Sequence, residues 1–304
     1  MTTNIVSEKG QGRRRALQCV LLLLLCAALA GCYWIGFRHE QRQTQQAPEV
    51  PLTEEDFALN FPFLAVTHAD HETESPDAVR IDLAQEEDEL LLSEGGNYRL
   101  TGKMIGQIRI AAEEQPVHLI LDGVSLTSKE GPAIWVESAG KLILTLAEGT
   151  ENQISDSGDY RRSPDTEACI FSAADLTING SGTLSVSGLY KDAIRSQNVV
   201  KILDGDISIR SKRTGIHGTD GIHITGGFLE ISSEKNGLRT TKSGRNGRGN
   251  LVVAGGDHRI IAGRFGFLVG RGDLYICNCS VFEKSVVAAW DVGGSVHVQS
   301  GCVQ

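Results

Sequence analysis

Short runs of alternating apolar and polar residues recur along the chain from about Asp77 onward. Each unit contains one alternating run, a glycine-rich turn and a second alternating run, as in 200–209 and 222–231. The starts of these two units are 22 residues apart, and the same step separates Leu274 from Val296. Alternation with a period of two predicts β-strands, and no stretch shows the periodicity of a long helix. A regular repeat of strands predicts a solenoid of stacked coils.

A column of apolar residues at equivalent positions supports the same register. In each unit a large apolar residue follows a small one, at Ile134, Ile170, Ile194, Ile216, Leu238 and Phe267. Such a column predicts an inward stack of side chains, which requires a coiled parallel sheet. A β-sandwich would explain short strands, but not a column held in step over six units. The pattern therefore predicts an all-β parallel β-helix with coils of roughly 22 residues over residues 77–304.

The N-terminal region predicts export and lipid attachment. A basic stretch at 9–15 precedes the apolar run Val20 to Leu29. This run is shorter than the ~20 apolar residues that span a bilayer, but it suits a signal peptide. Leu29-Ala30-Gly31-Cys32 matches the lipobox of bacterial lipoproteins. We expect a signal peptide at 1–31 and lipid on Cys32; the alternative is an uncleaved signal anchor.

Residues 32–76 are expected to form a polar tether. The segment is rich in glutamine and punctuated by Pro48, Pro51, Pro62 and Pro76. The alternating apolar residues Phe57, Leu59, Phe61 and Phe63 at its end are expected to pack on the first coil. The predicted location is extracytoplasmic and membrane-anchored through lipid. Because Tyr33 is not the aspartate that favours inner-membrane retention, the outer membrane or cell surface is favoured.

Charge is distributed unevenly along the chain. Residues 32–189 carry 10 basic and 27 acidic residues, whereas residues 190–304 carry 15 basic and 10 acidic ones. This excess of basic residues in the C-terminal part predicts a basic surface that faces an acidic partner. Nucleic acid is excluded as a partner because an exported protein seldom meets it.

Basic residues occupy equivalent positions in successive coils. One column contains Lys191, Arg213, Lys235 and Arg264, and a second contains Arg195, His217 and Arg239. Equivalent residues in stacked strands lie about 4.8 Å apart, so a column of like charges repels itself. A uronate polymer along the helix axis would supply carboxylates, which arginine binds through two hydrogen bonds. The alternative is a set of solvated turn residues.

Several segments resemble a known family: Asp122-Gly-Val-Ser-Leu-Thr-Ser128, Gly131-Pro-Ala-Ile134, Leu144-Thr-Leu-Ala-Glu-Gly-Thr-Glu-Asn152, Ile170-Phe-Ser172 and Leu176-Thr-Ile-Asn-Gly-Ser-Gly-Thr-Leu184. The chain resembles the carbohydrate-binding domain-containing proteins typified by a clostridial cell-surface protein that binds cellulose and acidic sugars. The resemblance implies a right-handed parallel β-helix of the pectate-lyase type, polysaccharide binding, and calcium held by acidic turns. The family's turns tend to read Asp-Asp-Gly-Ile or Asn-Asp-Gly-Ile. In the corresponding turns of this chain, Asp192 is the one acidic residue that remains. Because calcium prefers several carboxylate or carbonyl oxygens, calcium binding by the C-terminal coils is in doubt.

The insertion Ser155 to Glu167 is a second candidate site. Its carboxylates are candidate calcium ligands, together with one from the next coil: Asp156, Asp159, Asp165 and Asp192. A mobile acidic loop is the alternative. Tyr160 in the insertion, and Trp135 and Phe171 beside the basic columns, offer aromatic rings that sugars stack on or that shield strand edges.

Three functional classes follow from these patterns. The favoured one is non-catalytic binding of an acidic (uronate-containing) or cellulosic polysaccharide at the cell surface. The second is a uronate lyase, which would need a basic residue with a strongly lowered pKa. The third is a surface adhesion or scaffold protein that pairs through strand edges near Val303, including with its own copies. Cys279 and Cys302 fall on neighbouring coils, where either a disulfide or free thiols fit.

Overall fold

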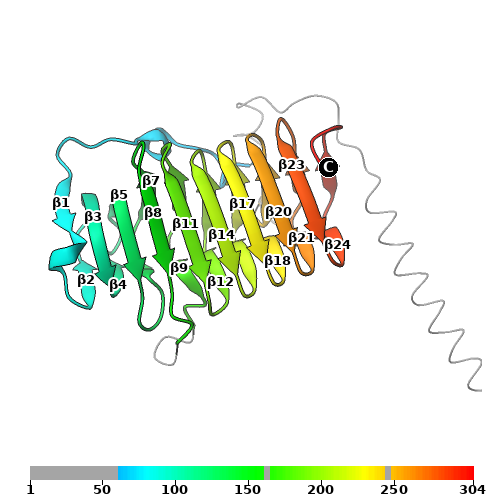
Figure 1. The fold of residues 1–304 in the computed structure, drawn as a ribbon. Helices are drawn as coiled ribbons and strands as arrows, with labels where there is room; N and C mark the ends of the chain where they lie inside the picture. Colours follow the sequence, from blue (N-terminus) through cyan, green and yellow to red (C-terminus); the bar gives the residue numbers. More distant parts are fainter. Residues whose placement is uncertain (1–60, 161–164, 244–247) are drawn as a thin grey trace, which may run out of the picture. The chain divides into compact units, whose positions relative to one another are not determined.

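The computed structural model describes residues 61–160, 165–243 and 248–304, and these residues form a parallel β-helix (Figure 1). The predicted fold class is therefore confirmed. Each complete coil contributes one strand to each of three faces. The strands step along the helix axis in chain order, from β1 at one end to β24 and β25 at the other.

Face 2 is a separate sheet of nine described strands. They are β2 (Glu89–Leu92), β4 (Gln107–Ala111), β6 (Ile134–Ser138), β9 (Ala168–Ser172), β12 (Asp192–Ser196), β15 (Thr214–Gly218), β18 (Asn236–Ser243), β21 (Phe265–Arg271) and β24 (Ala288–Val292).

Faces 1 and 3 are two arms of one 16-stranded sheet. Face 1 contains β8 (Glu151–Ser155), β11 (Thr183–Gly188), β14 (Asp206–Ser211), β17 (Phe228–Ser233), β20 (Asp257–Ala262) and β23 (Ser280–Ser285). Face 3 contains β7 (Lys141–Leu146), β10 (Leu176–Asn179), β13 (Val199–Ile202), β16 (Gly221–Ile224), β19 (Asn250–Val253), β22 (Leu274–Ile276) and β25 (Val296–Val298). The first coils join the arms through β1 (Val79–Asp82), β3 (Gly96–Ile105) and β5 (Pro116–Thr127).

The long strand β5 joins the two arms because it changes direction in its middle. Its first half pairs with β7 on face 3, and Ser125 to Thr127 pair with β8 on face 1. Gly123 lies between the two halves with a φ of 78°. That left-handed conformation is readily adopted only by glycine, so this residue permits the bend.

The inward stack on face 2 is present in the predicted register. Ile194 pairs with Ile216, and Ile216 pairs with Leu238, each step being 22 residues. All six predicted members are fully buried, and Trp290 continues the same column beyond Phe267. Small residues precede the stack because space is tight there. A Cβ at Gly215 would come within 2.6 Å of the Ile231 side chain.

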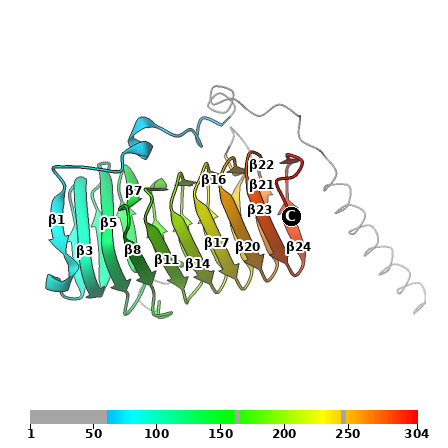
Figure 2. The ribbon, with the colours of Figure 1, turned by 45° about the horizontal axis from the view of Figure 1, so that its top comes forward.

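An N-terminal strap, residues 61–76, packs along the outside of face 3 (Figure 2). The ring of Phe61 lies edge-on to Tyr275 at 4.9 Å between centroids. Leu64 packs with Val199 and Val252, and its carbonyl oxygen accepts a hydrogen bond from His223 Nδ1 at 2.9 Å. The strap therefore crosses from late coils toward early ones before it enters β1.

Asp70, in the 3-10 helix η1 (His68–His71), anchors the strap. Its buried carboxylate accepts hydrogen bonds from Lys141 Nζ at 2.8 Å, Lys201 Nζ at 3.1 Å and Thr177 Oγ1 at 2.5 Å. Burial raises the pKa of Asp70, but these donors outweigh burial and hold the pKa far below its ordinary value. Asn179 Nδ2 also donates to the Asp70 carbonyl oxygen at 2.8 Å.

Two expectations for the N-terminal region are wrong in part. Residues 61–76, assigned to the tether, pack on the solenoid, because the outer residues of face 3 present the polar partners that Asp70 needs. Phe61 contacts the late strand β22 and not the first coil. The predicted signal peptide, Cys32 and tether residues 32–60 lie outside the described residues. A second 3-10 helix, η2, covers Leu83–Gln85.

In the part of the chain that the structure describes, no helix is long and apolar enough to cross a bilayer.

We predict that Asp70→Asn destabilises the fold by about 3 kcal/mol, because it leaves the buried Lys201 without its carboxylate. Urea unfolding at pH 7 measures the change. Asp257→Asn alters an exposed aspartate and is the matched control, which we expect to stay within about 0.5 kcal/mol of the parent. Equal stability of the two variants would contradict the anchoring role of Asp70.

Candidate functional site: a basic corner between faces 1 and 2

The first basic column lies where face 1 turns into face 2. Each main-chain N–H in the column donates to the carbonyl oxygen one coil earlier: Arg213 to Lys191 at 2.8 Å, Lys235 to Arg213 at 3.1 Å, and Arg264 to Lys235 at 2.7 Å. These bonds confirm that the four residues occupy one position in successive coils. We call them the basic corner.

The second basic column runs beside the corner on the outside of face 2. Arg195 pairs in register with His217, and His217 pairs with Arg239. The same column begins earlier with Arg109, Trp135 and Phe171. The two predicted columns are therefore adjacent, and together they form one cationic surface.

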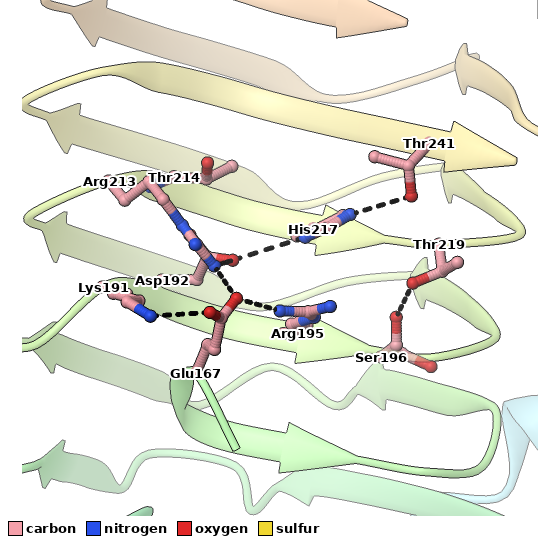
Figure 3. A network of polar contacts seen from close by, with 10 residues as sticks. All are labelled: Glu167, Lys191, Asp192, Arg195, Ser196, Arg213, Thr214, His217, Thr219 and Thr241. Carbon is pink, nitrogen blue, oxygen red and sulfur yellow. Dashed lines mark hydrogen bonds and ion pairs between the residues drawn. The ribbon is translucent and has the colours of Figure 1, made fainter. Parts of the chain in front are cut away.

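Glu167 gathers three of these cations (Figure 3). Its Oε1 accepts a hydrogen bond from Lys191 Nζ at 2.6 Å. Its Oε2 accepts from Arg195 Nη1 at 2.6 Å and from Arg213 Nη2 at 2.7 Å. Glu167 comes one coil before Lys191 at the same corner position, because Ala168 pairs with Asp192. On the sequence alone, Glu167 marks only the end of the insertion, although the register of the coils places it over Lys191.

Asp192 forms the second anionic centre, and it is fully buried. Arg213 binds it with two hydrogen bonds, Nε to Oδ1 at 2.7 Å and Nη2 to Oδ2 at 2.8 Å. The main-chain N–H of Thr214 donates to the same carboxylate at 3.1 Å. His217 Nδ1 lies 3.3 Å from Oδ2, and its Nε2 lies 3.2 Å from Thr241 Oγ1. One guanidinium thus bridges both carboxylates of the site.

The ion pairs fix the charge states of these groups. Burial raises the pKa of Glu167, but Arg213 and Lys191 outweigh burial and lower the pKa to about 2. The pKa of Asp192 also falls, because its bonds to Arg213 and His217 outweigh burial. Burial lowers the pKa of His217, with Asp192 opposing in part. At neutral pH both carboxylates are charged and the imidazole is neutral, so Nδ1–H donates to Asp192.

Arg239 forms no ion pair with either carboxylate, although their charges partly offset the effect of burial on its pKa. Among the described residues it forms no ion pair, and its Nε is buried without a hydrogen-bond partner. Burial lowers the pKa of its guanidinium. Lys235 and Arg264 beside it are exposed. At the Lys191 end of the site the cations are therefore paired with carboxylates, whereas at the Arg239 end they form no ion pair with Glu167 or Asp192.

The predicted aromatic residues differ in their exposure. Trp135 is partly exposed and lies 5.4 Å from the Arg109 guanidinium. Phe171 is only 4% exposed. Tyr160 is 3% exposed because its ring stacks on Tyr190 at 4.3 Å and its hydroxyl donates to Asp156 at 2.9 Å. Tyr160 therefore supports the neighbouring turn and presents no ring to a ligand. Tyr190, whose ring centroid lies 4.8 Å from Lys191 Nζ, is not among the aromatic residues predicted for the site.

The four predicted calcium ligands do not form one site. Asp156 is buried and accepts hydrogen bonds from the main-chain N–H of Leu189 at 2.8 Å and from the Tyr160 hydroxyl. It therefore links its own turn to the turn of the next coil. Asp192 is bound to Arg213. In 61–160, 165–243 and 248–304 no group of three metal-ligating side chains is close enough to hold an ion, so Asp159 and Asp165 do not complete a site there.

Cys169, Cys277, Cys279 and Cys302 are free thiols.

Comparisons with known proteins agree with this architecture. A family model described as carbohydrate-binding domain-containing protein matches residues 86–280, more than half of the chain. A protein of that description from Acetivibrio thermocellus (strain ATCC 27405) is 32% identical over 135 residues, 42% of this chain and 47% of the relative. The chain thus spans about half the length of that curated relative.

A solved structure of a polysaccharide lyase-like protein from C. thermocellum, a gadolinium derivative, is also similar. The TM-score is 0.71 at 25% identity, and the match covers 74% of this chain and 97% of that one.

We predict that Glu167→Gln destabilises the chain on the order of 2 kcal/mol at pH 7 and leaves it less sensitive to acid. The folded-state pKa of Glu167 lies below its ordinary 4.5, so its stabilisation is complete above that value. It is lost as the pH falls toward 2. The free energy of unfolding between pH 7 and pH 2 measures the effect, with the exposed Glu148→Gln as control. If the difference in free energy of unfolding between the parent and Glu167→Gln stays constant with pH, the ion-pair network is contradicted.

Proposed function

This chain belongs to the family of carbohydrate-binding domain-containing proteins, and from that membership we propose that it binds an acidic polysaccharide without cutting it. The proposed contact surface is the basic corner with the adjoining Arg195–His217–Arg239 column. The observation that carries the proposal is Arg239, a half-buried guanidinium without a carboxylate partner among the described residues.

The repeat of the solenoid supports an extended ligand. Equivalent positions recur about every 4.8 Å along the axis. The exposed Lys235 and Arg264 lie one coil apart at the corner, and Arg239 lies beside Lys235 on the same coil, on face 2, so the three cations form one patch. A uronate polymer carries one carboxylate per sugar, and a guanidinium binds a carboxylate with two charge-assisted hydrogen bonds. A cellulosic polymer has no carboxylate, so this surface favours the acidic class.

Calcium is not needed for this mode of binding. Glu167 and Asp192, the carboxylates that a cation would bridge, are already bridged by Arg213. Direct contact between arginine and uronate takes the place of a metal bridge in the proposal. We expect binding to persist in chelator and to weaken as salt screens the charges.

Anchoring would hold the bound polymer at the cell surface. Lipid on Cys32 and residues 33–60 as the spacer remain predictions from the sequence. Incorporation of a radiolabelled fatty acid that is lost in Cys32→Ser is the expected result. Labelling that survives this substitution would contradict the anchor.

A lyase activity is the second candidate, and one observation favours it. The similar solved structure is that of a polysaccharide lyase-like protein, and a lyase needs a base for proton abstraction beside the uronate carboxyl. Lyase cleavage leaves an unsaturated product that absorbs ultraviolet light. The same binding experiment therefore separates the two functions.

We predict that Arg239→Ala weakens binding to polygalacturonate about tenfold, because a charge-assisted pair is lost. Isothermal titration at low salt with chelator measures affinity, while absorbance is followed for hours. Arg80→Ala, an exposed arginine of the first coil, is the matched control and should bind like the parent. Unchanged affinity in Arg239→Ala would contradict the site, and absorbance that grows with time would make the protein a lyase.

A further inference from the structure

Exposed apolar side chains gather on the coil that contains β23 and β24, at the end of the solenoid opposite β1 (Figure 1). Phe282 is 41% exposed, Val286 82% and Val287 60%. Phe282 points outward from face 1, because its neighbour Val281 is fully buried. Val286 and Val287 follow β23, where face 1 turns into face 2. We call Phe282, Val286 and Val287 the late-coil patch.

The patch continues the basic corner by one coil. The main-chain N–H of Val287 donates to the Arg264 carbonyl oxygen at 3.1 Å, just as the Arg264 N–H donates to Lys235. Val287 therefore occupies the position that holds a cation in each of the four preceding coils. Single exposed apolar residues are ordinary, but a group of them rimmed by polar residues marks a contact with a protein or a membrane.

Two exposed cations border the patch. Lys284 lies on β23 between Phe282 and Val286. Arg264 lies one coil earlier at the corner, next to Val287. In the ranges that the structure describes, neither cation forms an ion pair. The edge of the patch is therefore suited to an anionic partner.

The carboxylates of this coil do not lie at the edge of the patch on face 1. β23 and β24 carry two of them, Glu283 and Asp291. Glu283 pairs in register with the buried Ile260, so it faces inward, and burial raises its pKa. Asp291 lies on β24, which belongs to face 2. Arg259, one coil before Phe282, is already paired with Glu230 at 3.4 Å.

The N-terminal strap meets the solenoid at the same end. Phe61, the first residue that the structure describes, packs on Tyr275 of β22, the strand directly before β23. From there the strap runs toward earlier coils (Figure 2). Cys32 precedes Phe61 by 29 residues, and a chain of that length spans at most about 100 Å. The predicted lipid on Cys32 would thus hold the solenoid through its late coils.

We propose that the late-coil patch rests on the surface of the bilayer and contacts anionic lipid. Its three apolar side chains enter the interfacial region, and Lys284 and Arg264 meet phosphate headgroups. The lipid anchor supplies affinity, and the patch sets the orientation, with β1 pointing away from the membrane. The proposal rests on the predicted membrane attachment and not on polysaccharide binding.

The test is contact of an added tryptophan with lipid, in the full chain bound to vesicles of phosphatidylcholine and phosphatidylglycerol. Brominated acyl chains quench a tryptophan that touches them. Val287→Trp places a ring in the patch, and Val79→Trp places one on β1 at a valine of similar exposure, 57%. After the parent's emission is subtracted, we expect about twofold quenching of Val287→Trp and none of Val79→Trp. Equal quenching of the two, or none of Val287→Trp, would overturn the proposal.

The charge requirement is tested in the Val287→Trp background. We expect Lys284→Glu to restore about half of the quenched emission, because it repels anionic headgroups. Lys103→Glu, at an exposed lysine of the early strand β3, is the control and should leave the quenching unchanged. Quenching that is equally strong in phosphatidylcholine alone would overturn the anionic lipid as partner.

Two further outcomes are distinguished by the same samples. Blue-shifted emission of Val287→Trp without quenching would show the patch covered by protein, such as a second copy, and would overturn the membrane contact. Sedimentation with the vesicles confirms that the chain is membrane-bound in each sample. A failure of the Cys32 anchor is therefore seen separately from a failure of the patch to touch lipid.

Discussion

Parallel pairing of each coil with the next is the constraint on which the rest of the structure depends. The buried column from Ile134 to Phe267 holds the register, and a shift by one residue would turn every inward side chain outward. With the register fixed, each outward position becomes a column along the axis. Arginines that are far apart in the chain become neighbours, as do serines on the adjacent face.

A column of like charges repels itself, and nearby carboxylates reduce that repulsion. Glu167 and Asp192 do this for Lys191, Arg195 and Arg213, with Arg213 bridging both acids. Neither carboxylate forms an ion pair with Arg239, and burial lowers the pKa of that guanidinium. An arginine occupies the place between two carboxylates that a cation could otherwise fill.

The fold and the columns could be predicted because both follow from a repeat that is visible along the chain. The partners of the columns could not all be predicted. Glu167 does not stand out in the sequence because it lies one coil before the first lysine of the column, at the end of an insertion. The packing of the strap on late coils depends on Asp70 meeting Lys201, 131 residues away, which no local pattern reveals. Tyr160 was expected at the surface, but its hydroxyl is satisfied by Asp156 within its own loop.

In the proposed function, a uronate chain lies along the basic corner and is held directly by arginine. A crystal structure of the chain with a short oligogalacturonate, grown in chelator, tests it most directly. We expect a sugar carboxylate within hydrogen-bond distance of the Arg239 guanidinium, with further sugars following the axis past Lys235 and Arg264. An oligomer found elsewhere with Arg239 unoccupied, or one held only after calcium is added, would contradict it.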